Sequence, residues 1–221
     1  MATRTLLGAL LALGVALLLA TPVHSADIQL RLHGSNTLGS KLGPGLLEAY
    51  AREKGFSDIT KVERAAAEFL ISARHADGSK FSGTVKAHGT NTGYADLVAG
   101  SADIWMASRA ASDSEVADAT AIGDLRSAAQ EHVIALDGLA IAVHPDNPIA
   151  TLPLAKIREA FAGRISNWAQ LGGADRPIVL YARDDKSGTF DSFKSMVLSD
   201  GSQLAASAQR FESSADLEKA I

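Results

Sequence analysis

Short runs of β-forming residues alternate along this chain of 221 residues with segments whose apolar residues recur at helical spacing. Residues 28–32 (IQLRL) alternate between apolar and polar, as expected of a strand, whereas Leu38, Leu42 and Leu46 recur every fourth residue, as expected of a helix. Such strand–helix alternation is typical of α/β folds with mainly parallel sheets. We therefore expect an α/β fold.

The same patterns predict where the other elements lie. Further strands are expected at residues 62–64, 85–88, 103–106 and 178–181. Helices are expected at residues 38–50, 65–73, 94–100, 113–129, 154–161, 190–197 and 213–221. Residues 77–83 (DGSKFSG) predict a turn. Residues 132–143 (HVIALDGLAIAV) form a long apolar run that Asp137-Gly138 interrupts.

The composition indicates a globular protein with a hydrophobic core. Hydrophobic residues make up 47% of the chain, which is ordinary for a globular domain. The formal net charge of −4 argues against a nucleic-acid partner, because nucleic-acid-binding domains carry basic surfaces. The chain contains no cysteine, which excludes disulfides, thiol catalysis, cysteine-ligated metals and a lipid-anchored cysteine. Core packing alone must therefore hold the fold together.

The first 25 residues have the pattern of a cleaved export signal. Arg4 precedes the apolar run LLGALLALGVALLLA, and Val23 and Ser25 fit the small-residue positions of a signal-peptidase site before Ala26. The alternative is a retained membrane anchor, but the run is shorter than the roughly 20 residues that a transmembrane helix needs. We expect a signal peptide over residues 1–25 and a location in the periplasm of a Gram-negative bacterium.

Three loops share one design, in which Gly is combined with Ser, Thr or Asn between an expected strand and an expected helix. They are Gly34-Ser35-Asn36-Thr37, Gly89-Thr90-Asn91-Thr92-Gly93 and Ser187-Gly188-Thr189. The first turn of a helix leaves backbone N–H groups without partners and carries partial positive charge. Glycine lets a ligand approach the backbone closely. The pattern predicts a site for phosphate, sulfate or carboxylate; the alternative is simple helix capping by these residues.

Two arginines lie near these loops in the sequence. Arg109 ends the stretch DIWMASR, and Arg183 precedes Ser187 by four residues. A guanidinium offers a fork of donors that can bind two oxygens of one oxyanion. The alternative for Arg183 is a surface ion pair with Asp184 or Asp185.

Motifs for catalysis and metal binding are missing from the sequence. DDKSGT lacks the spacing of a P-loop, no Gly-x-Ser-x-Gly nucleophile elbow occurs, and the histidines show no His-Glu-x-x-His spacing. We therefore expect no cofactor, no metal and no enzymatic activity.

Five blocks of sequence, in order, carry a resemblance to a known family. They are HGSNTL, AHGTNTGYADLVAGSADIWMASR, EHVIALDGLAIAVHPDNP, FAGRISNWAQLGG and YARDDKSGTFDSF. Together they resemble the periplasmic phosphate-binding proteins of phosphate ABC transporters, and among them a PstS-like branch sometimes fused to an OmpA-type domain.

The resemblance implies a two-lobed type II periplasmic-binding-protein fold with the ligand between the lobes. We place lobe I at residues 26–115 and lobe II at residues 116–221. In that fold the chain returns to complete the first lobe. Because the sequence stops at Ile221, we expect either a fragment of a longer chain or an incomplete first lobe.

The resemblance also implies a set of phosphate-binding residues. By position in the motifs they are Ser35, Asn36, Thr37, Thr90, Asn91, Arg183, Ser187, Gly188 and Thr189. The family's best-known members use an aspartate to accept the phosphate hydrogen, but this sequence has Ser108-Arg109 in that region. We include Ser108 and Arg109 in the candidate site, and Asp137 as a substitute acceptor.

The function that the resemblance implies is binding of inorganic phosphate for uptake by an inner-membrane ABC permease, and we expect a monomer. Three alternatives remain at this point. The ligand could be another oxyanion such as sulfate or molybdate, the protein could be a secreted phosphatase, or a truncated binder could have a structural role.

Overall fold

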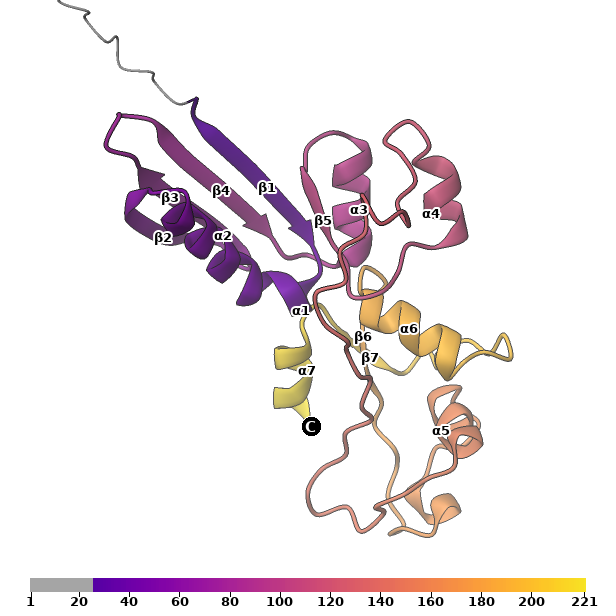
Figure 1. Cartoon of the computed structure of the whole chain (residues 1–221). Coiled ribbons are helices and arrows are strands. Elements are labelled where there is room, and N and C mark those ends of the chain that lie inside the picture. Colours follow the sequence, from indigo (N-terminus) through magenta and orange to yellow (C-terminus); the bar gives the residue numbers. More distant parts are fainter. Residues whose placement is uncertain (1–25) are drawn as a thin grey trace, which may run out of the picture.

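The computed structural model describes residues 26–221, so the expected signal peptide lies outside the described residues. Figure 1 shows the elements. The strands are β1 (Ile28–Gly34), β2 (Ser57–Ala65), β3 (Glu68–Arg74), β4 (Lys80–Lys86), β5 (Ile104–Met106), β6 (Tyr181–Arg183) and β7 (Gln209–Phe211). The helices are α1 (Asn36–Gly39), α2 (Leu42–Glu53), α3 (Thr90–Val98), α4 (Asp113–Asp118), α5 (Leu154–Phe161), α6 (Gly188–Met196) and α7 (Ser214–Ala220), with a 3₁₀ turn, η1, at Trp168–Leu171.

The larger sheet has five strands in the order β2-β3-β4-β1-β5. β1 pairs in parallel with β4 and β5, whereas β3 pairs antiparallel with β2 and β4. β6 and β7 form a separate parallel pair. The expected α/β fold with mainly parallel pairing is confirmed. Because β1, β4 and β5 run in the same direction, the loops that follow them gather at one edge of the sheet (Figure 1).

A hydrophobic core lies between α2 and the larger sheet. Leu47 and Ala51, four residues apart on α2, are buried with Ile71, Phe81 and Val85 of the sheet. Figure 1 shows α2 alongside β3 and β4.

The helix expected at residues 38–50 forms as two pieces, and the side chains that face the core differ from the series seen in the sequence. Leu42 and Leu46 are exposed. The inner face of α2 instead carries Leu47 and Ala51.

A second core lies in the carboxyl-proximal half. Phe190, Phe193 and Val197 line the buried face of α6 and pack with Ala182 of β6 and Phe161 of α5. The phenylalanines recur at the spacing expected of a helix, and α5 begins and ends as the sequence predicts. No helix within residues 26–221 is long and apolar enough to cross a bilayer. The boundary between two lobes near residue 115 stays a prediction.

The expected helix at residues 65–73 is wrong, because this segment forms a turn and strand β3. Ala67 has a left-handed backbone conformation (φ 58°) that ends any helix and allows β3 to fold back on β2. Ile71 and Ala73 are then buried with a period of two. Local preference for helix in this alanine-rich segment is overridden by pairing with β4, which the sequence pattern does not reveal.

Two further expectations are only partly correct. The segment 77–83 does begin with a turn, but β4 already starts at Lys80. The helix expected at residues 113–129 is limited to α4, whose first turn has a capping box between Ser112 and Glu115. Gly123 then adopts φ 130°, which is incompatible with a continuing helix.

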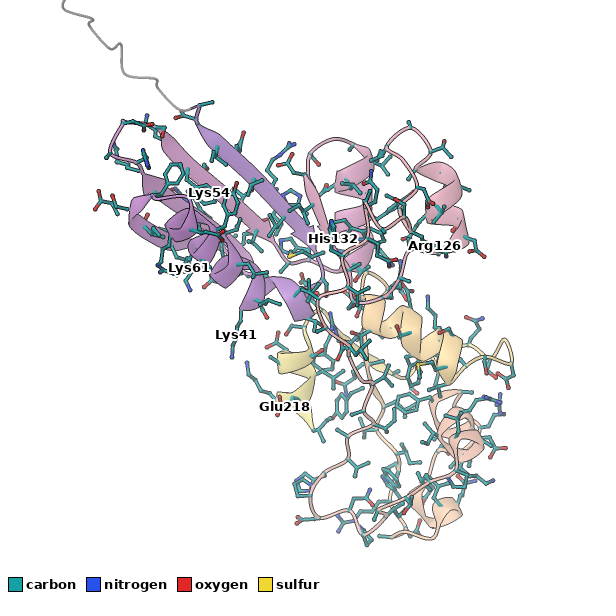
Figure 2. All side chains as sticks on the ribbon, in the orientation of Figure 1. Lys41, Lys54, Lys61, Arg126, His132 and Glu218 are labelled. Atoms are coloured by element: carbon teal, nitrogen blue, oxygen red, sulfur yellow. The ribbon has the colours of Figure 1, made fainter. Side chains whose placement is uncertain are left out.

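The apolar run at residues 132–143 has neither helix nor strand. Its Leu136 side chain is 96% exposed, and Val133 and Ile134 are also exposed. Part of this run borders an open apolar hollow of about 980 Å³ between α5, α6 and α7. Lys41 and Glu218, both labelled in Figure 2, are among the residues that line this hollow.

Candidate functional site

The three loops singled out in the sequence meet at one small cavity, here called the junction cavity. The space between its lining atoms is about 120 Å³, part of it open to solvent. It is lined by Ser35, Asn36, Thr37, Gly89, Thr90, Ser108, Arg183, Ser187, Gly188 and Thr189. The lining residues come from the starts of α1, α3 and α6, the loop after β5, and the end of β6. In Figure 1 these element ends converge near the centre of the molecule.

The first loop connects β1 to α1. The Ser35 amide donates a hydrogen bond to the Met106 carbonyl oxygen (2.8 Å), which fixes the loop beside β5. Ser35 is the N-cap of α1, but its hydroxyl makes no capping hydrogen bond. The Asn36 amide nitrogen donates to the Ala87 carbonyl, while Thr37 is exposed. The alternative interpretation of this loop as a simple helix cap therefore does not account for the Ser35 hydroxyl.

The second loop begins α3 and buries Thr90 completely. The Thr90 hydroxyl lies 3.2 Å from the Ser108 hydroxyl, and the Ser108 amide donates to it (3.3 Å). The Trp105 indole donates to the Thr90 carbonyl (2.7 Å). Gly89 has φ 110°, and a Cβ there would lie 2.4 Å from the Lys186 carbonyl oxygen. Glycine is thus needed for the second loop to approach the third.

The third loop begins α6, where Ser187 is the N-cap and is 1% exposed. Its hydroxyl accepts a hydrogen bond from the Phe190 amide (3.4 Å), so here the capping interpretation is correct. A Cβ on Gly188 would lie 2.4 Å from the Thr90 hydroxyl oxygen and 2.7 Å from that of Ser108. A side chain at residue 188 would therefore occupy the junction cavity.

Arg183 is the cation of the junction cavity, and it is only 5% exposed. Its guanidinium donates to the Asn36 side-chain oxygen (3.0 Å), the Ser214 hydroxyl (2.9 Å) and backbone carbonyls of residues 211 and 212. Among the residues that the structure describes, none forms an ion pair with it. Burial lowers the Arg183 pKa, although Asp184 and Glu212 act against this from a longer distance.

A buried guanidinium keeps its proton even when its pKa falls, because the ordinary pKa of this group lies far above neutral pH. Arg183 is therefore a desolvated positive charge held by neutral oxygen atoms. Burial of a charge without a counter-ion is costly. The surroundings of Arg183 therefore favour a bound anion.

Arg109 differs from Arg183, because it lies outside the lining of the junction cavity and is fully paired. Its guanidinium makes two hydrogen bonds to Glu115 (2.7 and 2.8 Å) and one each to Asp191 (3.1 Å) and Asn91 (2.7 Å). The hydrogen bonds that Arg109 donates to Glu115 raise the Arg109 pKa against the opposing effect of burial. Burial raises the pKa of Glu115, but the hydrogen bonds from Arg109 and Ser112 outweigh it, so the net shift is downward.

Two other candidate residues lie outside the cavity lining. The Asn91 side chain donates to the Asp185 carbonyl (2.9 Å) and accepts from Arg109, so its polar atoms are occupied by protein. Asp137 is exposed on the apolar hollow, where its carboxylate accepts from the next amide, that of Gly138 (2.8 Å). Gly89 also lines the cavity, although it is not among the ligands predicted above; its place between a strand and Thr90 is the signal in the sequence.

The lining of the junction cavity contains no carboxylate. Within residues 26–221 no group of three or more His, Asp or Glu side chains is arranged to hold a metal ion. The cavity instead offers hydroxyl groups, the amides at the starts of α3 and α6, and one guanidinium. These groups suit a single small oxyanion.

The fold and this cavity agree with the comparisons to known proteins. Residues 21–219 match the family described as the PBP superfamily domain, and the chain belongs to that family. The resemblance seen in the sequence blocks is confirmed. The Bacillus subtilis protein named phosphate-binding protein PstS is 35% identical over 121 residues, which are 55% of this chain and 38% of that protein.

Two solved structures have the same type II periplasmic-binding-protein fold. One is a crystal structure, with bound phosphate, of a Clostridium perfringens protein assigned as a phosphate ABC transporter substrate-binding protein (TM-score 0.65, 26% identity, 88% of this chain and 66% of that chain). The other is an ABC-type phosphate transport receptor from Vibrio cholerae (TM-score 0.58, 25% identity, 88% and 67%). The chain thus spans about two fifths of the Bacillus relative and two thirds of each solved structure.

Proposed function

We propose that the protein binds inorganic phosphate and presents it to the permease of an ABC transporter. The observation that carries the proposal is the buried Arg183 guanidinium, which faces the junction cavity without a carboxylate partner among the described residues. The confirmed family and the names of its relatives support the choice of ligand and partner. The same relatives support a location outside the cytoplasm, which we propose to be the periplasm, with the protein as a monomer.

Each part of the cavity has a role in this proposal. The Arg183 guanidinium donates four of its five N–H groups to protein oxygens, among them the Asn36 side chain, and the remaining N–H of Nη1 binds a phosphate oxygen. The remaining phosphate oxygens accept hydrogen bonds from the backbone amides near Gly188 and from the side-chain hydroxyls of the lining, which belong to Ser35, Thr37, Thr90, Ser108, Ser187 and Thr189. The lining offers hydroxyl groups, amides and one guanidinium within a small space, which suits a single small oxyanion and is too small for a nucleotide. Closure of loops from both halves over the ion removes water and strengthens every one of these contacts.

The experiment is calorimetric titration of the purified protein with phosphate, arsenate, sulfate and molybdate at several pH values. We expect phosphate to bind with micromolar or tighter affinity. An absence of heat with phosphate, together with heat for sulfate or molybdate, would reassign the ligand. An absence of heat with all four anions would contradict the proposal.

One observation favours a second candidate ligand. No carboxylate lines the cavity. The proton of a hydrogen phosphate ion therefore has no carboxylate to bind, and a sulfate ion, which has no proton, meets no carboxylate that would repel it. We therefore expect weaker discrimination against sulfate than a site with a carboxylate would give. Competition of sulfate with phosphate in the same titrations measures the discrimination.

We further propose that the site binds its ligand without chemistry. The hydroxyls of the cavity have neutral oxygen neighbours: Ser108 lies beside Thr90, and no histidine lines the cavity. A nucleophilic serine needs a base within hydrogen-bond distance. An assay with p-nitrophenyl phosphate should therefore show no turnover, and turnover lost on substitution of Ser108 or Ser187 would favour a phosphatase.

A further inference from the structure

We propose that Arg109 is a positioning residue of the anion site, which holds the second loop against the third without contacting the ion. The inference rests on the proposed function, because the site that it organises is the junction cavity. It changes the role expected from the sequence, where Arg109 was a candidate ligand of the anion.

The hydrogen bonds of Arg109 connect three segments that are distant in sequence. Glu115 lies on α4, Asn91 lies in the first turn of α3, and Asp191 lies in the first turn of α6. The guanidinium donates to all three side chains. Its face also lies over the Trp105 ring, with 5.9 Å between the guanidinium carbon and the ring centroid. Arg109 is therefore the centre of a link between α3, α4 and α6.

Asn91 extends this link to the third loop. Its backbone amide donates to the Lys186 carbonyl (3.1 Å), and its side chain donates to the Asp185 carbonyl (2.9 Å). Because Arg109 binds the Asn91 side-chain oxygen (2.7 Å), it orients the amide group for the second of these bonds. The two loops then meet closely enough that both Gly89 and Gly188 have no room for a Cβ.

The charges explain why a link is needed at this place. The N-termini of α3 and α6 both face the junction cavity and both carry partial positive charge. In the ligand-free protein these ends and the Arg183 cation repel one another. The Arg109–Asp191 ion pair (3.1 Å) attracts α6 to the loop after β5, and Arg109 in turn holds α3 through the Asn91 side chain. The side chains of the ion pair are only 16% and 20% exposed. The pair thus holds the cavity assembled before the anion arrives.

Arg109 has little capacity left for the anion itself. Two carboxylates and one amide oxygen occupy its nitrogen atoms, and it also donates to the Ala110 carbonyl (3.0 Å). Arg183, by contrast, has no carboxylate among the described residues within ion-pair distance. Arg183 therefore provides the positive charge that binds the ligand, whereas Arg109 holds the loops of the site in position.

The primary variant is Asp191→Asn, which removes the ion pair and leaves both the cavity lining and the Arg109–Glu115 pair in place. We expect phosphate affinity to fall by about 5- to 150-fold, the usual range for coupling between sites. The loss should appear mainly as faster dissociation in stopped-flow measurements. Lys194→Gln is the matched control, because Lys194 forms a more exposed ion pair with the same carboxylate (2.9 Å) from within α6. The control should bind like the wild type.

A second readout does not depend on phosphate. Amide hydrogen exchange of Asn91, measured by NMR in the ligand-free protein, should become faster in Asp191→Asn and remain unchanged in Lys194→Gln. If wild-type protein shows no phosphate binding but the exchange result holds, the proposed function fails and the positioning role stands. Unchanged exchange and unchanged phosphate affinity in Asp191→Asn would overturn the positioning role.

Direct binding of the anion by Arg109 gives a different pattern. In that case Arg109→Gln would weaken phosphate binding while Asp191→Asn would leave it unchanged or strengthen it, because a competing carboxylate is gone. If Arg109 is a positioning residue, both single variants weaken phosphate binding. The double variant then binds phosphate no more weakly than the weaker of the two single variants, since each substitution removes the same link. Melting temperatures of all variants show whether they are folded.

Discussion

At the scale of single residues, this protein uses one residue type for two opposite purposes. Arg109 neutralises Glu115 and Asp191, while Arg183 is surrounded by neutral oxygen atoms and keeps its charge for a ligand. The difference is not in the local sequence, since both arginines lie near Ser and Asp residues. It depends on which side chains from distant segments surround each guanidinium.

The first prediction concerns Arg183. Arg183→Ala should reduce the binding free energy of phosphate by about 2–5 kcal/mol, as when one partner of a buried charge pair is truncated. Arg183→Lys keeps the charge but loses the planar fork, so its phosphate affinity should lie between that of the wild type and that of Arg183→Ala. Calorimetry measures the phosphate affinities, and thermal melting measures how much stability is lost with the contacts to Asn36 and Ser214. A loss below about 0.5 kcal/mol, typical of surface substitutions, would place Arg183 outside the site.

The second prediction uses the close approach at Gly188. In Gly188→Ala the added methyl group would lie 2.4 Å from the Thr90 hydroxyl oxygen, so the variant should lose detectable phosphate binding while it remains folded. Gly45→Ala on α2 is the matched control, because a Cβ there meets nothing within 4 Å. The control should bind normally and gain about 0.5–1 kcal/mol of stability as a helical Gly→Ala change. Normal binding by Gly188→Ala would contradict the placement of the anion.

At the scale of elements, the larger sheet and the carboxyl-terminal segment are joined beside the second loop by His88. The His88 ring lies 3.0 Å from the Glu68 carboxylate of β3 and 2.9 Å from that of Glu212, which follows β7. Burial lowers the His88 pKa, but the hydrogen bonds that the ring donates to Glu212 and Glu68 outweigh it, and the net pKa is raised. Protonated His88 therefore connects two elements that are far apart in the sequence.

A pH dependence of stability follows from this raised pKa. The contribution of His88 is complete below its ordinary pKa of about 6.5 and is lost as the pH rises through the higher pKa of the folded state. Because the groups are partly exposed, we expect less than about 1 kcal/mol, or up to about 2–4 °C in melting temperature. The comparison is wild type against His88→Gln across this pH range, with exposed His132→Gln as control. Identical profiles for wild type and His88→Gln would refute the link.

The elements also show where sequence patterns succeed. β1, β5, α5 and α7 lie close to their expected positions, because their alternation or helical spacing agrees with their tertiary surroundings. Residues 65–73 fail, since their pairing partners lie in β2 and β4 and local composition favours a helix. The apolar run 132–143 also gives no regular element, as no described strand pairs with it.

At the scale of the whole molecule, ligand binding should stabilise the fold, because the junction cavity joins segments from both halves of the chain. At a phosphate concentration 100 times the Kd, the stabilisation is about 2.7 kcal/mol, which for a chain of this size corresponds to roughly 5–10 °C in melting temperature. Differential scanning fluorimetry with and without phosphate measures the shift. Chloride at equal ionic strength should give no shift, and phosphate should shift Arg183→Ala much less than the wild type. An equal shift with chloride would reveal a general salt effect.

Sequence patterns alone predict the α/β class, the three Gly/Ser/Thr loops and most of the residues that line the junction cavity. These features depend on local chemistry, namely hydrophobic period, helix starts and the donors that each residue carries. Packing in three dimensions brings the loops together, turns Arg183 toward the cavity, and leaves Arg109, Asn91 and Asp137 outside its lining. Whether an arginine is neutralised depends on carboxylates that reach it from other elements, such as Asp191 for Arg109. Because those contacts are set by packing over long sequence separations, no single stretch of the chain contains them.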